Sequence, residues 1–206
     1  WRVLNWIPSP KDTRDRTFAD AGFLRSARTI PAASLPRVVD HRDRCPPIED
    51  QGTLGSCTGQ AVVGGCEFLH FKDRLSMTRD FSRLFAYYNG RRMMGSRYIG
   101  IDSGCYIRTV IKAAARYGLC DEAMWPYDTG LYAVKPPVSA YADASRWQLT
   151  EYACVTGRTH EESVGNIRRT IAAGHTVAFG MEVYESFTSP DTETTGVVPF
   201  PDTKSE

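Results

Sequence analysis

The 206-residue chain lacks several features that would assign it to a broad class. No apolar run approaches the roughly 20 residues that a membrane-spanning helix needs. The net charge is only +1, so bulk charge favours neither nucleic acid nor an anionic membrane as a partner. No internal repeat or low-complexity tract is present, and Trp1 begins no signal-peptide pattern. Because an initiator methionine is also absent, we expect a trimmed or processed form.

The spacing of the cysteines excludes two common uses. None of the 6 cysteines forms a Cys-x-x-Cys pair, which argues against a structural zinc site and a thioredoxin-like redox site. The sequence implies no metal and no organic cofactor. Cys66 lies in an apolar helical run and is most simply a buried small hydrophobe. A disulfide remains open among four others: Cys45, Cys105, Cys120 and Cys154.

The most informative segment is Gln51-Gly52-Thr53-Leu54-Gly55-Ser56-Cys57, in which a glycine-bearing turn separates an amide from a thiol. An amphipathic, helix-like run begins at Cys57. The positive end of a helix dipole favours thiolate over thiol, and thiolate is the attacking species. An amide beside it, here Gln51, can hold the oxyanion that forms when thiolate attacks a carbonyl. The alternative for Cys57 is a buried structural cysteine, and the alternative for Gln51 is a polar turn residue.

Helical periodicity dominates the first half of the chain. A helix is predicted from Cys57 to about Lys72, although Gly64-Gly65 inside it costs about 1 kcal/mol for each glycine against alanine. That cost suggests close packing of another backbone against this face. Asp80 or Ser82 can cap a second helix, which carries Leu84, Phe85 and Tyr88.

A third helix follows, and Asp102 or Ser103 can cap it. Its apolar residues recur at helical spacing, and Gly118 ends it. These residues are Ile107, Val110, Ile111 and Ala114.

After an irregular connection marked by Pro126, Pro136 and Pro137, the pattern changes. Residues 146–156 are predicted to form a strand, and the alternation over 176–183 predicts another. Between them, Thr159-His160-Glu161-Glu162 is a capping box for a helix that ends at Gly174. With 42% hydrophobic residues the chain can bury a sizeable core, and the order of elements predicts an α+β fold.

The same sequence resembles the papain-like cysteine peptidases, in the form that we associate with their bacterial branch. The resemblance covers roughly residues 36–200. It rests on the segments 45–58, Ser82-Arg83-Leu84-Phe85-Ala86-Tyr87-Tyr88-Asn89, Asp102-Ser103-Gly104, Met124-Trp125-Pro126-Tyr127, Val183-Tyr184-Glu185-Ser186-Phe187 and Thr195-Gly196-Val197-Val198-Pro199. It implies a two-lobed fold with a helical left lobe, a barrel-like right lobe and a cleft between them.

The resemblance also divides the chain. Residues 36–206 would form the peptidase domain, with the C-terminal part of its right lobe missing. Residues 1–35 contain Trp1, Trp6 and a charged stretch with few apolar anchors, so they would not bury a core alone. They are either a surface arm packed by its tryptophans or, as the resemblance implies, a propeptide-like arm that covers the cleft.

The sequence departs from the family in identifiable places. Leu54 stands where plant and lysosomal members have the first cysteine of Cys-Gly-Ser-Cys, so the disulfide made by that cysteine cannot form. Thr58 replaces the following aromatic residue. The family's base histidine, and the Asn or Asp that orients it, would follow the Gly-Val-Val segment. We expect both beyond Glu206, after a nicked loop or a truncation, and the alternative is a truly short homologue that lacks them.

The four histidines are therefore interpreted as structural or solvent-exposed. His70 lies about a dozen residues along the first helix, roughly 20 Å from Cys57. His175 follows a helix end, where the dipole favours a cation. His41 and His160 lie in polar stretches.

The resemblance further assigns substrate binding to Ser103, Gly104, Cys105 and Tyr106, near the family's Gly-Gly-Tyr segment. Cys105 would narrow a subsite or present an oxidisable thiol there, or else it is a buried neighbour of the third helix. The partners would be protein or peptide substrates and the chain's own arm, with no nucleic acid and no membrane. The compartment stays open, and a secreted or cell-envelope location is preferred over a cytoplasmic one.

Together these interpretations predict a cysteine endopeptidase that acts through a Cys57 thiolate and a thioester, held as a zymogen by its arm. Two alternatives are kept. One is an inactive binding or regulatory homologue that lacks the base, and the other is a cysteine-dependent acyl transferase or amidase.

Overall fold

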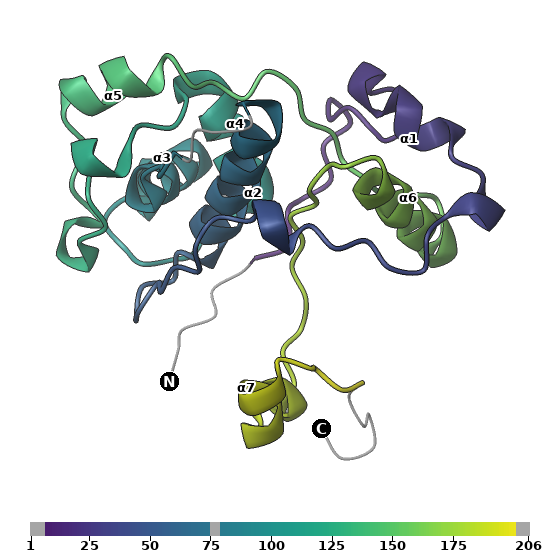
Figure 1. Cartoon of the computed structure of the whole chain (residues 1–206). Helices are drawn as coiled ribbons and strands as arrows, with labels where there is room; N and C mark the ends of the chain where they lie inside the picture. The colour runs from purple at the N-terminus through teal and green to yellow at the C-terminus, as the bar shows by residue number, and fades with distance from the viewer. Residues whose placement is uncertain (1–6, 75–78, 201–206) are drawn as a thin grey trace.

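A computed structural model describes residues 7–74 and 79–200 of the chain, and its helices gather in two groups (Figure 1). One group contains α2 (Cys57–Arg74), α3 (Arg83–Met94), α4 (Ile107–Tyr117) and α5 (Val138–Ala144). The other contains α1 (Arg25–Thr29) and α6 (His160–Ala172), and α7 (Pro190–Thr195) lies apart from both. Within the described ranges, no helix combines the length and apolarity needed to cross a bilayer.

The first group, which we call the helical lobe, packs around α3. Leu84, Phe85 and Tyr87 are all fully buried, although α3 carries no strong amphipathic pattern. Its neighbours approach closely because two contact points are glycines. A Cβ on Gly59 of α2 would lie 3.1 Å from the carbonyl oxygen of Arg83, and one on Gly90 would lie 2.7 Å from a methyl carbon of Val110. In this lobe α2 and α4 therefore both pack closely against α3, which lies at the centre.

Most predicted helices and their ends are confirmed. Ser82 caps α3 by accepting a hydrogen bond from the Phe85 N–H, and Thr159 caps α6 by accepting one from the Glu162 N–H. Gly118 ends α4 with a φ of 82°, a left-handed conformation that glycine adopts readily. The predicted cap of α4 is wrong, because Tyr106 precedes that helix without a side-chain cap. The carboxylate of Asp102 is engaged elsewhere, as described below.

The prediction for Gly64-Gly65 is also partly wrong. A Cβ on Gly64 would meet nothing within 4 Å, whereas one on Gly65 would lie 3.2 Å from the hydroxyl oxygen of Thr176. The neighbour is therefore a side chain of the later segment rather than a backbone. The close backbone approach to α2 occurs instead at Gly59.

Neither predicted strand forms a ladder in the part of the chain that the structure describes. The amides of Trp147 and Leu149 donate to the carbonyls of Ala144 and Ala114, so this segment is tied to α5 and α4. Further along, only an isolated parallel bridge between Cys154 and Thr17 forms. Residues 176–183 have no regular secondary structure, and Phe179 is 67% exposed. Alternation alone does not make a strand, because a strand also needs a paired neighbour. Conversely, α5 and α7 form where irregular chain was expected.

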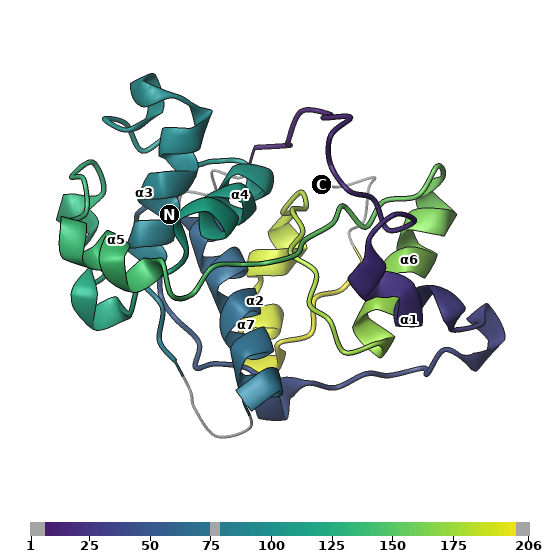
Figure 2. The ribbon, with the colours of Figure 1, turned by 90° about the horizontal axis from the view of Figure 1, so that it is seen from above.

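The described part of the arm, residues 7–35, is built into the fold. Phe18, Ala21, Leu24 and Ala27 form a buried cluster, against which Ala153, Val155 and Ala173 of the second group pack. Figure 2 shows α1 lying beside α6. The prediction that this segment cannot bury a core alone is consistent with this packing, since the core is shared. Trp1 and Trp6 lie outside the described residues.

The preceding stretch of the arm contacts the helical lobe. The Asp15 carboxylate lies 2.6 Å from the Arg108 guanidinium and 3.4 Å from the Lys112 amine, and Asp12 lies 3.2 Å from the same amine. Hydrogen bonds from Arg14 and then Lys112 lower the pKa of Asp12, so this carboxylate stays charged. The arm thus connects both groups of helices.

Candidate active site

The segment that precedes α2 is a tight turn that is partly buried. Gly52 has a φ of 59°, and its N–H donates to the Asp50 carboxylate at 2.9 Å. The Leu54 N–H reaches back to the Gln51 carbonyl at 3.4 Å. Leu54 and Ser56 are buried, while Gln51 and Cys57 are half-exposed. The turn therefore exposes Gly52 and Thr53 and buries the three residues directly before Cys57.

Gln51 and Cys57 are positioned by this single turn. The Gln51 side-chain amide donates to the Leu54 carbonyl at 2.8 Å, which fixes its orientation and leaves a second N–H on the same nitrogen. Cys57 is the first residue of the 18-residue α2, as predicted. The early N–H groups of a helix have no partner within that helix, and its dipole places positive charge at this end. Activation of Cys57 as a nucleophile by this helix start stays a prediction.

Tyr127, which lies in the connection after α4, contacts the turn through its hydroxyl group. Its hydroxyl lies 2.5 Å from the Ser56 hydroxyl and 3.1 Å from the Gln51 carbonyl oxygen. A phenol has one proton, so Tyr127 donates it to the carbonyl and Ser56 donates to Tyr127. Burial raises the pKa of Tyr127, which keeps that proton in place.

Asp102 also contacts the turn, through its carboxylate. One carboxylate oxygen accepts the Gly55 N–H at 2.8 Å, and the other accepts the Tyr87 hydroxyl at 2.5 Å. Tyr87 in turn accepts the Gly104 N–H at 3.1 Å. The loop before Cys57 is therefore tied to α3 and to the segment that leads into α4.

The expected substrate-binding residues lie in that segment. Ser103 is half-buried, and its hydroxyl donates to the Gly104 carbonyl at 2.8 Å. Gly104 is buried with a φ of 67°, and Tyr106 is half-exposed. The Cys105 thiol is fully buried, 2.9 Å from the Thr58 hydroxyl, and burial raises its pKa to about 12. This agrees with the alternative in which Cys105 is a buried neighbour of the third helix.

Comparison with known proteins places this geometry in a family. No protein-family model matches the chain. An uncharacterised peptidase C1-like protein of Acanthamoeba polyphaga mimivirus is 41% identical over 155 residues, which are 74% of this chain and 49% of that protein. The crystal structure of xylellain, a cysteine protease from Xylella fastidiosa, superposes with a TM-score of 0.67 at 30% identity, over 83% of this chain and 63% of xylellain.

The chain is a relative of the papain-like C1 cysteine peptidases. The match to xylellain shows the papain-like fold. The described part of the present chain is mostly helical. The chain spans about half the length of the viral relative and less than two thirds of xylellain. The resemblance inferred from the sequence segments is thereby confirmed.

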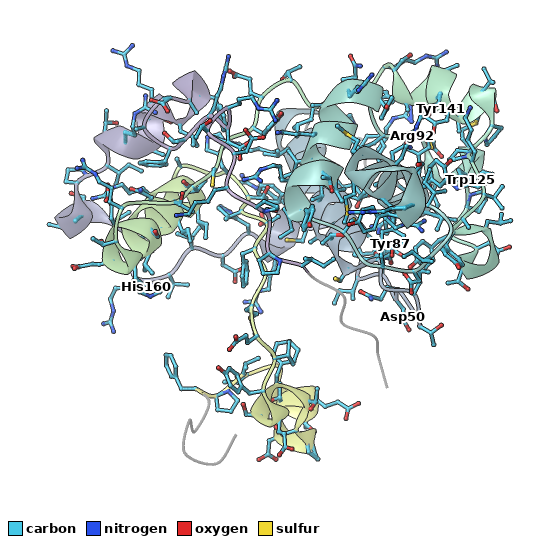
Figure 3. All side chains as sticks on the ribbon, turned by 180° about the vertical axis from the view of Figure 1, so that it is seen from behind. Asp50, Tyr87, Arg92, Trp125, Tyr141 and His160 are labelled. Carbon is cyan, nitrogen blue, oxygen red and sulfur yellow. The ribbon has the colours of Figure 1, made fainter. Side chains whose placement is uncertain are left out.

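The histidines of this papain-like chain have structural surroundings. His41 lies 3.3 Å from the Ile171 carbonyl oxygen, and its ring packs on Phe68. The His70 ring packs edge-on against Trp147, far along α2 from Cys57. The His175 ring meets Phe23. His160 is exposed at the start of α6, and Figure 3 shows it far from Tyr87 and Asp50.

A cavity of about 460 Å³ lies between the arm, α2, α4 and α6, but its walls include neither Gln51 nor Cys57. All 6 cysteines lie in the described ranges, and none forms a disulfide. No cluster of three or more potential metal-ligating side chains occurs among the described residues.

Neither Tyr87 nor Tyr127 was predicted to have a role, and Asp102 was predicted to cap a helix. All three lie in segments that carried the family resemblance. The signal was therefore present in the co-occurrence of these segments, but not in any local pattern.

Proposed function

We propose that this chain is the nucleophile-bearing part of a cysteine endopeptidase. The observation that carries the proposal is the single turn that presents Gln51 and Cys57 together at the start of α2, in a fold shared with a cysteine protease. A thiolate at a helix N-terminus beside an amide donor matches what acyl transfer through a thioester requires.

In the proposed reaction, the Cys57 thiolate attacks the carbonyl carbon of the scissile peptide bond. The free N–H of the Gln51 amide and the backbone N–H of Cys57 donate to the resulting oxyanion. Collapse of the tetrahedral intermediate breaks the C–N bond and leaves a thioester on Cys57. A histidine in its imidazolium form gives a proton to the departing amine as general acid, and the neutral imidazole then takes a proton from the water that hydrolyses the thioester. We place that histidine outside residues 1–206, because the histidines of this chain have other surroundings.

The proposal includes the arm as an inhibitor of the site. Residues 10–15 run past the start of α4, which directly follows Ser103–Tyr106, and the carbonyl of Pro10 accepts a hydrogen bond from Arg108. Asp12 and Asp15 form ion pairs with Lys112 and Arg108 of α4, and we call these ion pairs the clasp. An arm held here can lie along the substrate-binding segment. Releasing the clasp should therefore open the site without removing the core that residues 17–35 share with the second group.

The arm is tested by Asp12→Asn/Asp15→Asn, with Asp20→Asn as the matched control. Asp20 accepts a hydrogen bond from Thr17, within the arm itself, at 2.6 Å. We expect faster peptide cleavage from the double variant at low ionic strength, and a smaller difference at high salt, where the clasp is already screened. Equal rates for the wild type, the double variant and the control at both ionic strengths would contradict inhibition by the arm.

The reaction is tested by incubating the full-length protein with a diverse peptide library and analysing the products by mass spectrometry. We expect cleavage that Cys57→Ala abolishes and that Cys45→Ala, which removes an exposed cysteine, leaves unchanged. Turnover of small acyl donors without peptide cleavage would indicate an acyl transferase or amidase instead. Neither activity, together with retained peptide binding, would indicate an inactive binding homologue.

A further inference from the structure

One carboxylate joins two segments that are far apart in the sequence. Asp102 accepts the Gly55 N–H at 2.8 Å and the Tyr87 hydroxyl at 2.5 Å. The Gly104 N–H donates to the same hydroxyl at 3.1 Å. Gly55 lies two residues before Cys57, and Gly104 lies in the expected substrate-binding segment. The chain of contacts therefore links the nucleophile to the surface on which a peptide would lie.

The contacts have one consistent assignment of protons. Tyr87 has a single hydroxyl proton, which goes to the carboxylate, so its oxygen is left to accept from Gly104. Tyr87 is fully buried, and burial, followed by the hydrogen bond to Asp102, raises its pKa. Gly55 and Gly104 are buried as well. Without these acceptors, two buried backbone N–H groups would lose their partners.

Arg91 contacts both Tyr87 and the residue directly before Asp102. Its guanidinium is fully buried, lies 4.2 Å from the centre of the Tyr87 ring and donates to the Ile101 carbonyl at 2.9 Å. It thereby fixes both the ring of Tyr87 and the residue immediately before Asp102. Figure 3 shows Tyr87 within the helical lobe, on the same side as Asp50 at the start of the turn.

We propose that Asp102 and Tyr87 are positioning residues that hold the nucleophile turn and the substrate-binding segment in register. The proposal rests on the proposed function, because only a peptide that contacts both segments makes their register matter. Asp102 acts mainly on the turn through Gly55, and Tyr87 acts mainly on the substrate segment through Gly104. The two residues should therefore have separable effects on catalysis and on binding.

The variants follow from the contacts. Asp102→Ala removes both carboxylate oxygens, which accept from the Gly55 N–H and the Tyr87 hydroxyl. Asp102→Asn keeps the side-chain shape and one acceptor oxygen. Tyr87→Phe removes the acceptor of the Gly104 N–H but leaves the contact between Asp102 and Gly55. Two matched controls make similar contacts elsewhere: Asp143→Asn, whose carboxylate accepts the Asp121 N–H at 2.9 Å, and Tyr141→Phe, whose hydroxyl donates to Asn89 at 2.9 Å.

The experiment uses the full-length protein and three readouts. Iodoacetamide alkylation of Cys57 is followed by peptide mapping, hydrogen exchange is measured for peptides covering residues 51–57 and 102–106, and kcat and KM are measured on a peptide substrate. We expect Asp102→Ala to lower kcat at least tenfold, to change the alkylation rate and to speed exchange over 51–57. Asp102→Asn should lie between Asp102→Ala and the wild type. Tyr87→Phe should raise KM about threefold to tenfold and speed exchange over 102–106, with kcat within about threefold.

The outcomes separate the two proposals. If the wild type cleaves no peptide, alkylation and exchange still test the positioning role while the proposed function fails. If Asp102→Ala does not fold, Asp102→Asn and Tyr87→Phe decide. The positioning role is overturned if the Asp102 and Tyr87 variants match Asp143→Asn and Tyr141→Phe in alkylation and exchange. It is also overturned if kcat and KM change together in every variant.

Discussion

Replacing Glu122 with glutamine should stabilise the protein at high pH and leave it unchanged at low pH. Glu122 is half-buried, and one of its oxygens accepts the Tyr127 N–H at 2.5 Å. The other oxygen is buried with no hydrogen-bond partner among the described residues. Desolvation by burial is the main cause that raises its pKa from an ordinary 4.5 to about 7. Asp80 and Glu49 raise it further, while Tyr127 and Arg83 lower it.

The direction of the pH effect follows from proton linkage. Because the folded state holds the Glu122 proton more tightly than the unfolded state, stability is greatest below pH 4.5 and falls as the pH rises to 7. At about 1.36 kcal/mol for each pH unit, this interval corresponds to about 3 kcal/mol. Solvent reaches the half-buried side chain and screens its charge, so we expect about 1 kcal/mol. Glutamine mimics the protonated acid and still accepts the Tyr127 N–H.

The assay is urea unfolding at pH 4 and pH 8, followed by tryptophan fluorescence. Glu122→Gln should exceed the wild type by about 1 kcal/mol in free energy of unfolding at pH 8 and match it at pH 4. Glu193→Gln, a change of an exposed carboxylate in α7, should run parallel to the wild type. A difference between Glu122→Gln and the wild type that is the same at both pH values would refute the reasoning.

Three further predictions follow from the packing. Gly118→Ala should lower the free energy of unfolding by more than about 2 kcal/mol in urea unfolding, because the new Cβ would lie 1.7 Å from the Ala144 carbonyl oxygen at a left-handed φ. Tyr127→Phe, which removes the contacts to Ser56 and Gln51, should slow alkylation of Cys57 at least threefold while leaving the melting temperature within a few degrees; an unchanged alkylation rate would contradict a role in holding the turn. Leu24→Ala should cost about 2–5 kcal/mol in thermal or urea unfolding, since Leu24 is 1% exposed in the core that the arm shares with the second group; a loss below 1 kcal/mol would mean that the arm is dispensable for stability.

Local chemistry was sufficient to predict the longer helices and several of their ends. The caps at Ser82 and Thr159 and the stop at Gly118 depend on residues within a few positions of the helix end, so a short sequence window contains the necessary information. The strands expected at 146–156 and 176–183 were wrong because pairing depends on distant chain. Residues near Trp147 instead bond to the ends of α4 and α5.

The candidate site shows the same division. Gln51 and Cys57 could be identified from the sequence because one turn contains both. The side chains that hold the turn could not, since Asp102 reaches Gly55 and Tyr127 reaches Ser56 across the fold. Asp102 before a helix is chemically a reasonable cap, and only the folded arrangement shows that its carboxylate is used elsewhere.

The most direct test of the central proposal is labelling of the full-length protein with a thiol-directed peptidyl epoxide, read by intact mass and peptide mapping. We predict one adduct, located on Cys57, that is lost in Cys57→Ala and formed more slowly in Gln51→Ala. Exposed Cys45 serves as the internal control and should remain unlabelled. No adduct on Cys57, or equal labelling of Cys45 and Cys57, would contradict an activated nucleophile at the start of α2.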